Sequence, residues 1–463
     1  MSISSEITRI NTNISNAYTA VGNKGGTLPV TQNSANLATA ISSITTGGGS
    51  SIPVQEKDIN FYDYDGTRLH SYTLAEVQEL TELPELPTQQ GLTCQGWNWT
   101  LADLKAEGKP TDVGATYITD DGKTRLYIHI TTDGRMNVPL YFRQSVENGI
   151  EVDWGDNSQP ETFSGSGSSN ITPIHQYSTI GDYVITLNPI NNCELTLGID
   201  DSNYCIVGRF SNASGIYKNM LIKAEIGKNV INISTSAFMY CFSLLYITIP
   251  KEVTNISYYS FWGCYNLLSI IIPKEITTIN AYMLNSCYSL KKAIMPSRLT
   301  TISSYAFQSC YSLPIITIPN RVTSISGSNF QNCFSLLKVT IPTGITTISG
   351  YMFQSCKSLS KIVMPNTITR INATVFSGCE SLTKITIPSQ LSYINSEAFA
   401  YCFGVGIYDF SNCSSIPTLG GSSAFSGISS DCKIVVPDSL YNDWISASNW
   451  STYSSYIVKA SEV

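Results

Sequence analysis

The chain has 463 residues, of which 42% are hydrophobic and only 13% are charged, and its formal net charge is −7. This low charge, together with 11% aromatic residues, excludes an intrinsically disordered chain, because disorder requires many charges and few apolar groups. The acidic balance disfavours a nucleic-acid binder, and no apolar run approaches the roughly 18 residues of a membrane span. The length predicts several domains.

Residues 1–50 have the pattern of a helical attachment or oligomerisation segment followed by a linker. Apolar residues recur at alternating spacings of four and three, as in the seam of a coiled coil: Ile3, Ile7, Ile10, Ile14, Ala17 and Val21. Isoleucine at both seam positions favours trimers or tetramers, so we expect a homo-oligomer, with a trimer favoured. The alternative is a short amphipathic helix that packs on its own chain.

The phrase KGGTLPVTQNSANLATAISSI, within the same segment, resembles N-terminal segments of phage and prophage tail proteins. This resemblance implies that residues 1–50 bind other tail proteins. It also implies a protein that is made in the host cytoplasm and carried on the virion tail. We expect no secretory signal or lipid anchor in this chain.

Residues 51–118 begin with DINFYDYDGTRLHSYT, which predicts two strands joined by a turn at Asp65-Gly66. With GLTCQGWNWT further on, the segment resembles the internalin-type B-repeat, a small β-grasp module, and this implies a spacer. Asp63-Tyr64-Asp65-Gly66 also resembles the start of a calcium loop, but the twelfth position is Leu74 instead of glutamate, which favours a hairpin turn.

Residues 119–200 contain VDWGDNSQPETF and HQYSTIGDYVITL. These motifs resemble a polycystic-kidney-disease (PKD) domain, which implies an immunoglobulin-like β-sandwich with Trp154 in its core. Asp153 and Asp156 are predicted to fix a turn by side-chain-to-backbone hydrogen bonds, although calcium binding there is an alternative.

Residues 201–437 contain a 23-residue repeat with eight full copies between Leu221 and Gly404. Its most regular column is cysteine, at Cys241, Cys264, Cys287, Cys310, Cys333, Cys356, Cys379 and Cys402. Such even spacing indicates a structural repeat, not a disulfide framework. Each copy reads S-L-x-x-I-x-I-P-x-x-V-T-x-I-x-x-x-x-F-x-x-C, in which a short strand ends at a proline that cannot donate to a ladder. We expect these strands to pair in parallel in one sheet, and the other half of each copy to form a turn or 3₁₀ segment.

The repeat pattern resembles the BspA-type leucine-rich repeat, whose members are mostly adhesive surface proteins, and this implies binding. Residues 438–463 are predicted to cap the open end of the solenoid. The fold class is therefore multidomain and mainly β, with an N-terminal helix, a β-grasp-like module, a PKD-like sandwich and a leucine-rich-repeat solenoid.

The sequence contains no catalytic or metal-binding constellation, so we expect no enzyme activity, no cofactor and no metal. The three histidines are widely separated, and the phosphate-loop and dinucleotide patterns are absent. The column cysteines are predicted to be buried free thiols that act as small hydrophobic side chains.

Two sets of outward residues are candidates for ligand or receptor binding. The first is a strand column with Tyr246, Lys292, Lys338, Lys361 and Lys384, and the second is a tyrosine column with Tyr259, Tyr282, Tyr305 and Tyr351. The lysines suit an anionic ligand, or they are a solvated stripe that keeps the sheet soluble. The tyrosines suit sugar or protein contacts, or they stack between neighbouring repeats.

The sequence thus predicts a phage or prophage tail protein that recognises a polysaccharide or protein on the surface of its bacterial host, without nucleic-acid binding or membrane insertion. A bacterial BspA-like surface adhesin is the alternative.

Overall fold

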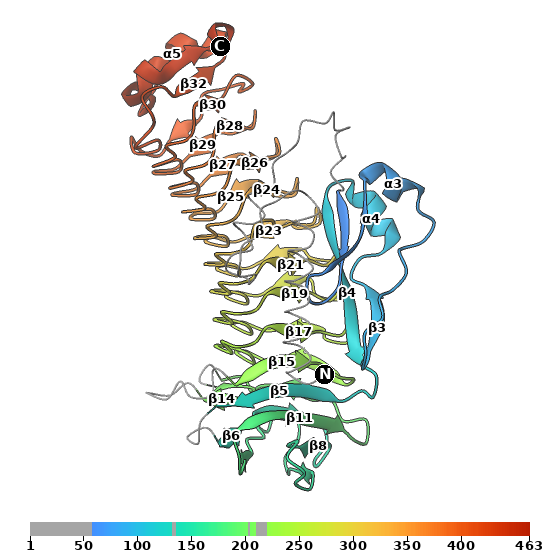
Figure 1. The fold of residues 1–463 in the computed structure, drawn as a ribbon. Coiled ribbons are helices and arrows are strands. Elements are labelled where there is room, and N and C mark those ends of the chain that lie inside the picture. Colours follow the sequence, from blue (N-terminus) through green and yellow to red (C-terminus); the bar gives the residue numbers. More distant parts are fainter. Residues whose placement is uncertain (1–57, 132–135, 202–203, 210–219) are drawn as a thin grey trace, which may run out of the picture. The chain divides into compact units, whose positions relative to one another are not determined.

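The computed structural model describes residues 58–131, 136–201, 204–209 and 220–463 (Figure 1). The predicted coiled-coil and tail-attachment segment, residues 1–50, lies outside the described residues. Residues 57–463 form one compact unit, and no described helix is long and apolar enough to cross a membrane.

The first part of this unit, residues 58–119, is a four-stranded sheet with two short helices, here called the module. Its elements are β1 (Ile59–Tyr62), β2 (Arg68–Tyr72), α3 (Leu74–Glu79), β3 (Leu92–Trp97), α4 (Leu101–Glu107) and β4 (Thr111–Thr119). Strands β1 and β2 form the predicted hairpin, whose turn is closed by a bond from the Gly66 N–H to the Asp63 carbonyl. The strand order is β2-β1-β4-β3. Thr73 begins α3 with a capping box that includes Glu76.

The next part, here called the sandwich, has two main sheets that share one core. Its strands are β5 (Thr124–Ile130), β6 (Asn137–Pro139), β7 (Phe142–Gln144), β8 (Ile150–Asp153), β9 (Glu161–Thr162), β10 (Ile174–Gln176), β11 (Gly181–Pro189), β12 (Leu195–Leu197), β13 (Tyr204–Cys205) and β14 (Gly208–Arg209). The first main sheet contains β5, β11, β8 and β9 and the second contains β7 and β12, and two further strand pairs, β6 with β10 and β13 with β14, complete the sandwich. Trp154 is fully buried, as predicted, together with Ile185 and Leu187 of β11. The assignments of this part to the PKD family and of the module to the internalin-type repeat stay predictions.

The solenoid contains two ladders of parallel strands. The first ladder is formed by β15 (Leu221–Glu225), β17 (Tyr246–Thr248), β19 (Ser269–Ile271), β21 (Lys292–Ile294), β24 (Lys338–Thr340), β26 (Lys361–Val363), β28 (Lys384–Thr386), β30 (Ile407–Asp409), β32 (Lys433–Val436) and β33 (Ile457–Lys459). The second is formed by β16 (Val230–Ile233), β18 (Asn255–Ile256), β20 (Thr278–Ile279), β22 (Thr301–Ile302), β23 (Ser324–Ile325), β25 (Thr347–Ile348), β27 (Arg370–Ile371), β29 (Tyr393–Ile394) and β31 (Thr418–Leu419).

Parallel pairing of successive repeats is confirmed, since Lys338 pairs with Lys361 and Ile348 with Ile371 in register. The prediction of a single sheet is wrong. The V-T-x-I half of each copy forms a second short ladder, in which the isoleucine and the residue before it both pair with the next repeat and the isoleucine is buried in the core.

Both sheets of the sandwich continue into the solenoid. Strand β5 pairs antiparallel with β15, which gives a six-stranded sheet of order β17-β15-β5-β11-β8-β9. Strand β12 pairs in parallel with β16, which gives the order β18-β16-β12-β7. The sandwich therefore occupies the edge that the first repeat would otherwise expose.

The other end is closed by residues 438–463. Here η2 (Asp438–Leu440), α5 (Tyr441–Ser446) and η3 (Trp450–Tyr456) precede β33, which extends the first ladder, and η4 (Ala460–Glu462) follows it. Trp444 and Trp450 are buried against Phe410 at ring-centroid distances of 5.4 Å. The indole N–H of Trp450 donates to the Pro417 carbonyl at 2.7 Å.

Candidate binding face

The outward side of the first ladder carries a column of residues that stand opposite one another on successive strands. Its members are Tyr246, Ser269, Lys292, Ile315, Lys338, Lys361, Lys384 and Ile407, and it is called the Lys column below. The register places Ser269 opposite Lys292, Ile315 opposite Lys338, and Lys338 opposite Lys361. Since strand residues alternate in direction, these side chains point away from the solenoid core.

The module covers the N-terminal part of this column. Tyr246 is only 8% exposed and packs against Tyr64 of the module, while the Ser269 hydroxyl donates to the Tyr64 carbonyl at 2.6 Å. Lys292 places its Nζ atom 2.9 Å from Asp112 Oδ2 and 4.3 Å from the ring centroid of Tyr62. The prediction that Tyr246 and Lys292 are free for a ligand is therefore wrong.

The module also buries apolar residues of the neighbouring outward column. Ile271 and Ile294 are 5% and 1% exposed and belong to one core cluster with Phe61 and Trp99 of the module. Strand β4 comes so close that a Cβ atom at Gly114 would lie 2.5 Å from Ile271 Cγ2. The expectation of a spacer is corrected accordingly: the module is folded back on the repeats and joined to them by a close apolar contact.

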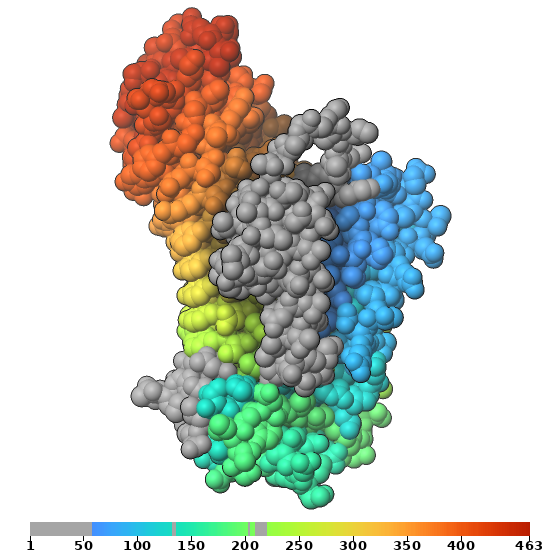
Figure 2. All heavy atoms as spheres, in the orientation of Figure 1, coloured from blue at the N-terminus to red at the C-terminus, as the bar shows by residue number. Residues whose placement is uncertain are grey.

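Beyond the module, the first ladder presents an uncovered surface, called the open face below. Its residues are Ile315, Leu337, Lys338, Lys361, Val363 and Lys384, all of them exposed. Lys384 pairs with Asp409 at 2.9 Å, whereas no ion pair within residues 220–463 involves Lys338 or Lys361. Figure 2 shows the repeats of this region in yellow and orange, with the module in blue. Three predicted lysines thus lie together on one surface, interleaved with exposed apolar side chains.

The tyrosine column forms a face-to-face stack. The rings of Tyr259 and Tyr282 lie 4.9 Å apart and those of Tyr282 and Tyr305 lie 4.7 Å apart, with interplanar angles of 21° and 11°. These three side chains are half-buried, so they offer edges and hydroxyls to a ligand and not flat faces. Tyr351 differs: it is 47% exposed, and the neighbouring positions of its column are Ser328 and Thr374.

Each of the four tyrosines adopts the left-handed conformation, with φ near +60°. This conformation costs roughly 1–2 kcal/mol for a residue with a Cβ atom. Stacking of aromatic rings offsets part of that cost, at about 0.5–1.5 kcal/mol per pair. The stacking interpretation therefore accounts for Tyr259, Tyr282 and Tyr305, and only Tyr351 retains the geometry of a ligand platform.

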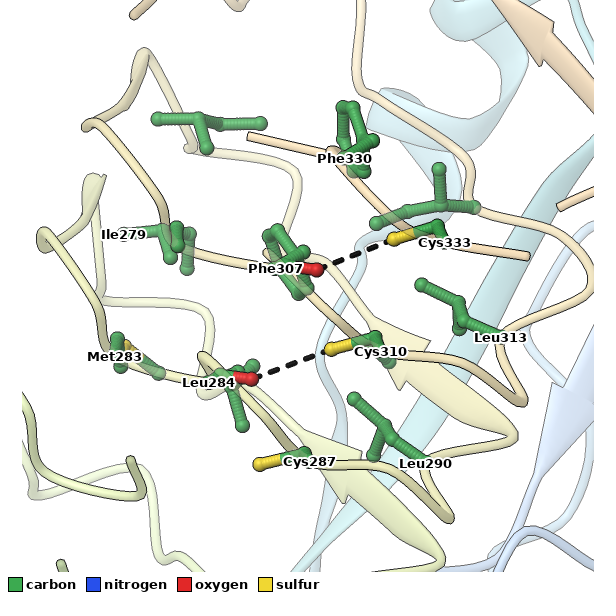
Figure 3. Packing of buried hydrophobic residues seen from close by; sticks show 14 of the residues in the cluster. Ile279, Met283, Leu284, Cys287, Leu290, Phe307, Cys310, Leu313, Phe330 and Cys333 are labelled. Carbon is green, nitrogen blue, oxygen red and sulfur yellow. Dashed lines mark hydrogen bonds between the residues drawn. The ribbon is translucent and has the colours of Figure 1, made fainter. Parts of the chain in front are cut away.

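The cysteine column lies in the core, and each of its thiols from Cys264 to Cys402 donates to a backbone carbonyl of the preceding repeat. Figure 3 shows two of these bonds, from Cys310 to the Leu284 carbonyl and from Cys333 to the Phe307 carbonyl, both at 3.2 Å. Burial raises the pKa of Cys333 to about 12. All thirteen cysteines are free. The column is therefore a structural one, but its thiols are hydrogen-bond donors as well as apolar groups.

Asp153 and Asp156 bond as predicted to the backbone of their own turn, the first to the Gly155 N–H at 2.9 Å and the second to the Ser158 N–H at 3.0 Å. Asp156 also contacts His175 at 2.8 Å. Burial opposes ionisation of Asp156, but hydrogen bonds from Ser158 and His175 outweigh it and lower the pKa of Asp156 to about 2. Over the part of the chain that the structure describes, no group of three acidic, histidine or cysteine side chains is arranged for a metal ion.

The sequence analysis did not identify the module residues that bind the covered part of the repeats. Asp112 is separated from Lys292 by 180 positions, and Asn98 from Ile272 by 174. The single sequence signal was the excess of basic over acidic residues in the repeats, which indicates that acidic partners come from elsewhere.

The comparisons with known proteins bear on the repeats. Residues 211–336 and 277–408 match the family model of the BspA type leucine-rich repeat region, with six copies. Among curated proteins no match is found.

Several solved structures are similar to this chain. A leucine rich cell surface protein of Faecalibacterium prausnitzii is 26% identical, over 46% of this chain and 72% of that chain, with a TM-score of 0.29. A leucine-rich repeat protein of Bacteroides ovatus is 17% identical, over 67% and 98%, with a TM-score of 0.26. The pneumococcal vaccine antigen PcpA is 14% identical, over 51% and 84%, with a TM-score of 0.27.

The unbroken 23-residue period, the stacked parallel strands and the family match agree with one another. Residues 211–408 are therefore a BspA-type leucine-rich repeat region, carried in a mainly β protein.

Proposed function

We propose that this chain is a recognition protein without enzyme activity, and that its open face binds an anionic component of a bacterial surface. The observation that carries the proposal is the pair Lys338 and Lys361, which stand opposite each other on adjacent strands. Like charges in this position destabilise a sheet by up to about 1 kcal/mol. An anionic ligand placed between them removes this repulsion.

The repeat architecture supports the same role. In a stack of repeats the inward residues build the core, and the outward residues are free to differ without disturbing it. Here the inward positions, such as Val339 and Ile385, are fully buried, while Lys338 and Lys384 beside them are exposed. The open face is therefore available for contacts that the fold itself does not need.

We propose two alternative settings in which the open face would act. In the first, residues 1–50 attach an oligomer, with a trimer favoured, to a phage or prophage tail, and the repeats reach the host envelope. The tail-like phrase of residues 24–44 supports it. In the second, the chain is a BspA-like adhesin of a bacterial surface, which the family of its repeats supports.

Binding of the full chain to bacterial cells tests the proposal. Fluorescent protein is incubated with a panel of cells at rising salt, and we expect binding that weakens with ionic strength because exposed charges are screened over about 8–10 Å. The variant K338S/K361S/K384S should lose most of the binding. Lys357→Ser is the matched control, because Lys357 pairs with Glu380 outside the open face. The proposal fails if no cells bind the parent, or if the triple variant binds as the parent does.

A further inference from the structure

The module already binds one lysine of the Lys column, Lys292. This contact shows which chemical groups can bind a lysine at that position. Lys292 Nζ donates to the Asp112 carboxylate at 2.9 Å and to the Tyr62 hydroxyl at 3.2 Å, and it lies over the Tyr62 ring at 4.3 Å from the centroid. A carboxylate beside an aromatic ring therefore satisfies a lysine at this position. Lys338 and Lys361 occupy equivalent positions two and three repeats further along the column.

The repeats themselves lack acidic residues that could pair with their basic ones over a long stretch. From residue 276 to residue 379 the chain has eight basic residues and no acidic one. The module supplies the missing carboxylates where it covers the face: Asp112 to Lys292, and Asp103 to Arg321 at 3.6 Å. Among the described residues, no carboxylate pairs with Lys338 or Lys361 of the open face, so the complement of this face is an acidic surface.

Backbone carbonyls before the proline column form a second recurring element of the docked surface. The carbonyls of Ile272, Met295 and Ile318 accept hydrogen bonds from the side chains of Asn98, Trp99 and Lys109, at 3.0, 2.8 and 2.7 Å. They are free to do so because the ladder position that would donate to each is a proline, which has no N–H.

The same geometry continues on the open face. The Ile341 N–H donates to the Val363 carbonyl, so a regular ladder would place the N–H of residue 365 on the Ile341 carbonyl, and residue 365 is proline. Over residues 220–463 no donor to this carbonyl is found. Ile315, Leu337 and Val363 add exposed apolar surface, at 45%, 46% and 40%.

We infer that the ligand of the open face is a protein that presents an acidic segment with aromatic side chains, in the manner in which Asp112 and Tyr62 meet Lys292. This inference rests on the proposed function and names its partner class. A protein offers carboxylates, N–H donors and apolar groups together, as the module does. A phosphate polymer offers only the charge, and a uronic-acid polysaccharide offers charge and hydroxyls but no N–H donor of the amide or indole kind.

Defined polymers test this inference on the full chain. The probe is a random copolymer of glutamate and tyrosine, compared with polyglutamate, polyphosphate and polygalacturonate of similar length at equal ionic strength. We expect the copolymer to bind most tightly. K338S and K361S should each weaken its binding by about tenfold, the loss of one well-placed charge pair. K384S should cost less, because Lys384 already pairs with Asp409, and K357S should leave binding unchanged.

Equal affinity for polyphosphate and the copolymer would overturn the inference, as would a preference for polygalacturonate. So would copolymer binding that K338S and K361S do not change. If cells bind through the open face but the copolymer does not, the inference fails and the proposed function stands. If neither cells nor any polymer bind, both fail.

Discussion

The Sγ atom of Cys333 lies 3.2 Å from the carbonyl oxygen of Phe307, one repeat earlier in the solenoid. The same carbonyl also accepts the backbone N–H of Cys310, in its own repeat, at 3.2 Å. The carbonyls at the equivalent position of the other repeats, from Phe238 to Phe376, each accept a hydrogen bond from the thiol of the following repeat in the same way. The cysteine column therefore joins successive repeats by hydrogen bonds in the middle of an apolar core.

Replacing Cys333 by alanine should lower the free energy of unfolding by about 1–2 kcal/mol, because it removes this bond and leaves a small cavity. Cys333→Ser keeps a hydrogen-bond donor, so it should lower the free energy of unfolding less than Cys333→Ala does. Chemical denaturation followed by circular dichroism measures both. Cys94→Ala is the control, since Cys94 is half-buried in the module, outside the column. A Cys333→Ala protein as stable as the parent would contradict a structural role for the thiol.

The raised pKa values of thiols in the cysteine column predict that the protein unfolds at alkaline pH. Burial raises the pKa of Cys333 and of Cys402 to about 12, from an ordinary value of 9.0. The unfolded thiols ionise first, so their contribution to stability is complete below pH 9 and is lost as the pH rises toward 12. The melting temperature measured from pH 8 to pH 11 should fall steeply, and less so in a C333A/C402A variant. Equal slopes for the two proteins would show that other groups control the transition.

Gly114→Ala should loosen the module from the repeats. The added Cβ would lie 2.5–2.8 Å from three atoms of Ile271, and overpacking of this kind costs about 1–3 kcal/mol. Limited proteolysis within residues 58–119 should become faster. Adding Ile271→Ala should restore protection, because it removes the clashing atoms. Gly406→Ala is the control, as its Cβ would meet only the Thr383 carbonyl at 3.8 Å. An unchanged rate of proteolysis for Gly114→Ala would show that the side chains around Ile271 adjust to the added Cβ while the module stays bound to the repeats.

A fragment of residues 220–463 should aggregate, whereas residues 58–463 should stay dispersed. The shorter fragment exposes the edge of β15 that β5 covers, and unpaired edges associate with one another. It also uncovers Tyr246 and Ile271. Size-exclusion chromatography of both fragments after identical purification measures the difference. A monodisperse short fragment would mean that the first repeat closes its own edge.

Residues 1–50 are predicted to hold copies of the chain together. Light scattering should give a multiple of the 50.6 kDa chain mass for the full protein and a single chain for residues 51–463. We expect this oligomer because isoleucine at both seam positions favours coiled coils of more than two helices. Equal monomeric masses would leave the packing of this helix on its own chain as the explanation.

The repeats were predictable because each position recurs at a fixed interval. The cysteine column is buried in every copy, and so are the columns that contain Phe307 and Leu313. Pro296 closely follows strand β21, as expected. The period also identified which residues face outward, and Lys338, Lys361 and Lys384 do so. Only the second ladder was missed, since strands of two residues such as Thr301–Ile302 leave no alternation to detect.

The covered half of the face was not predictable in the same way. Tyr246 and Lys292 do point outward from the solenoid, as their positions indicate. They are covered because Asp112 and Tyr64 come from a part of the chain that has no repeat and no periodic relation to them. Contacts between such distant segments depend on shape and charge in three dimensions, which hydrophobic patterns along the chain do not record.

The closure of both solenoid ends has a consequence for how such chains diverge. Duplication or loss of one 23-residue unit between residues 340 and 400 leaves β5, the module contacts and the Trp444–Trp450 cluster untouched. The solenoid, and the open face with it, lengthens or shortens by one repeat at a time. Relatives of this protein can therefore change the reach of that surface, and the number of charges on it, through single recombination events that never pass through an unfolded ancestor.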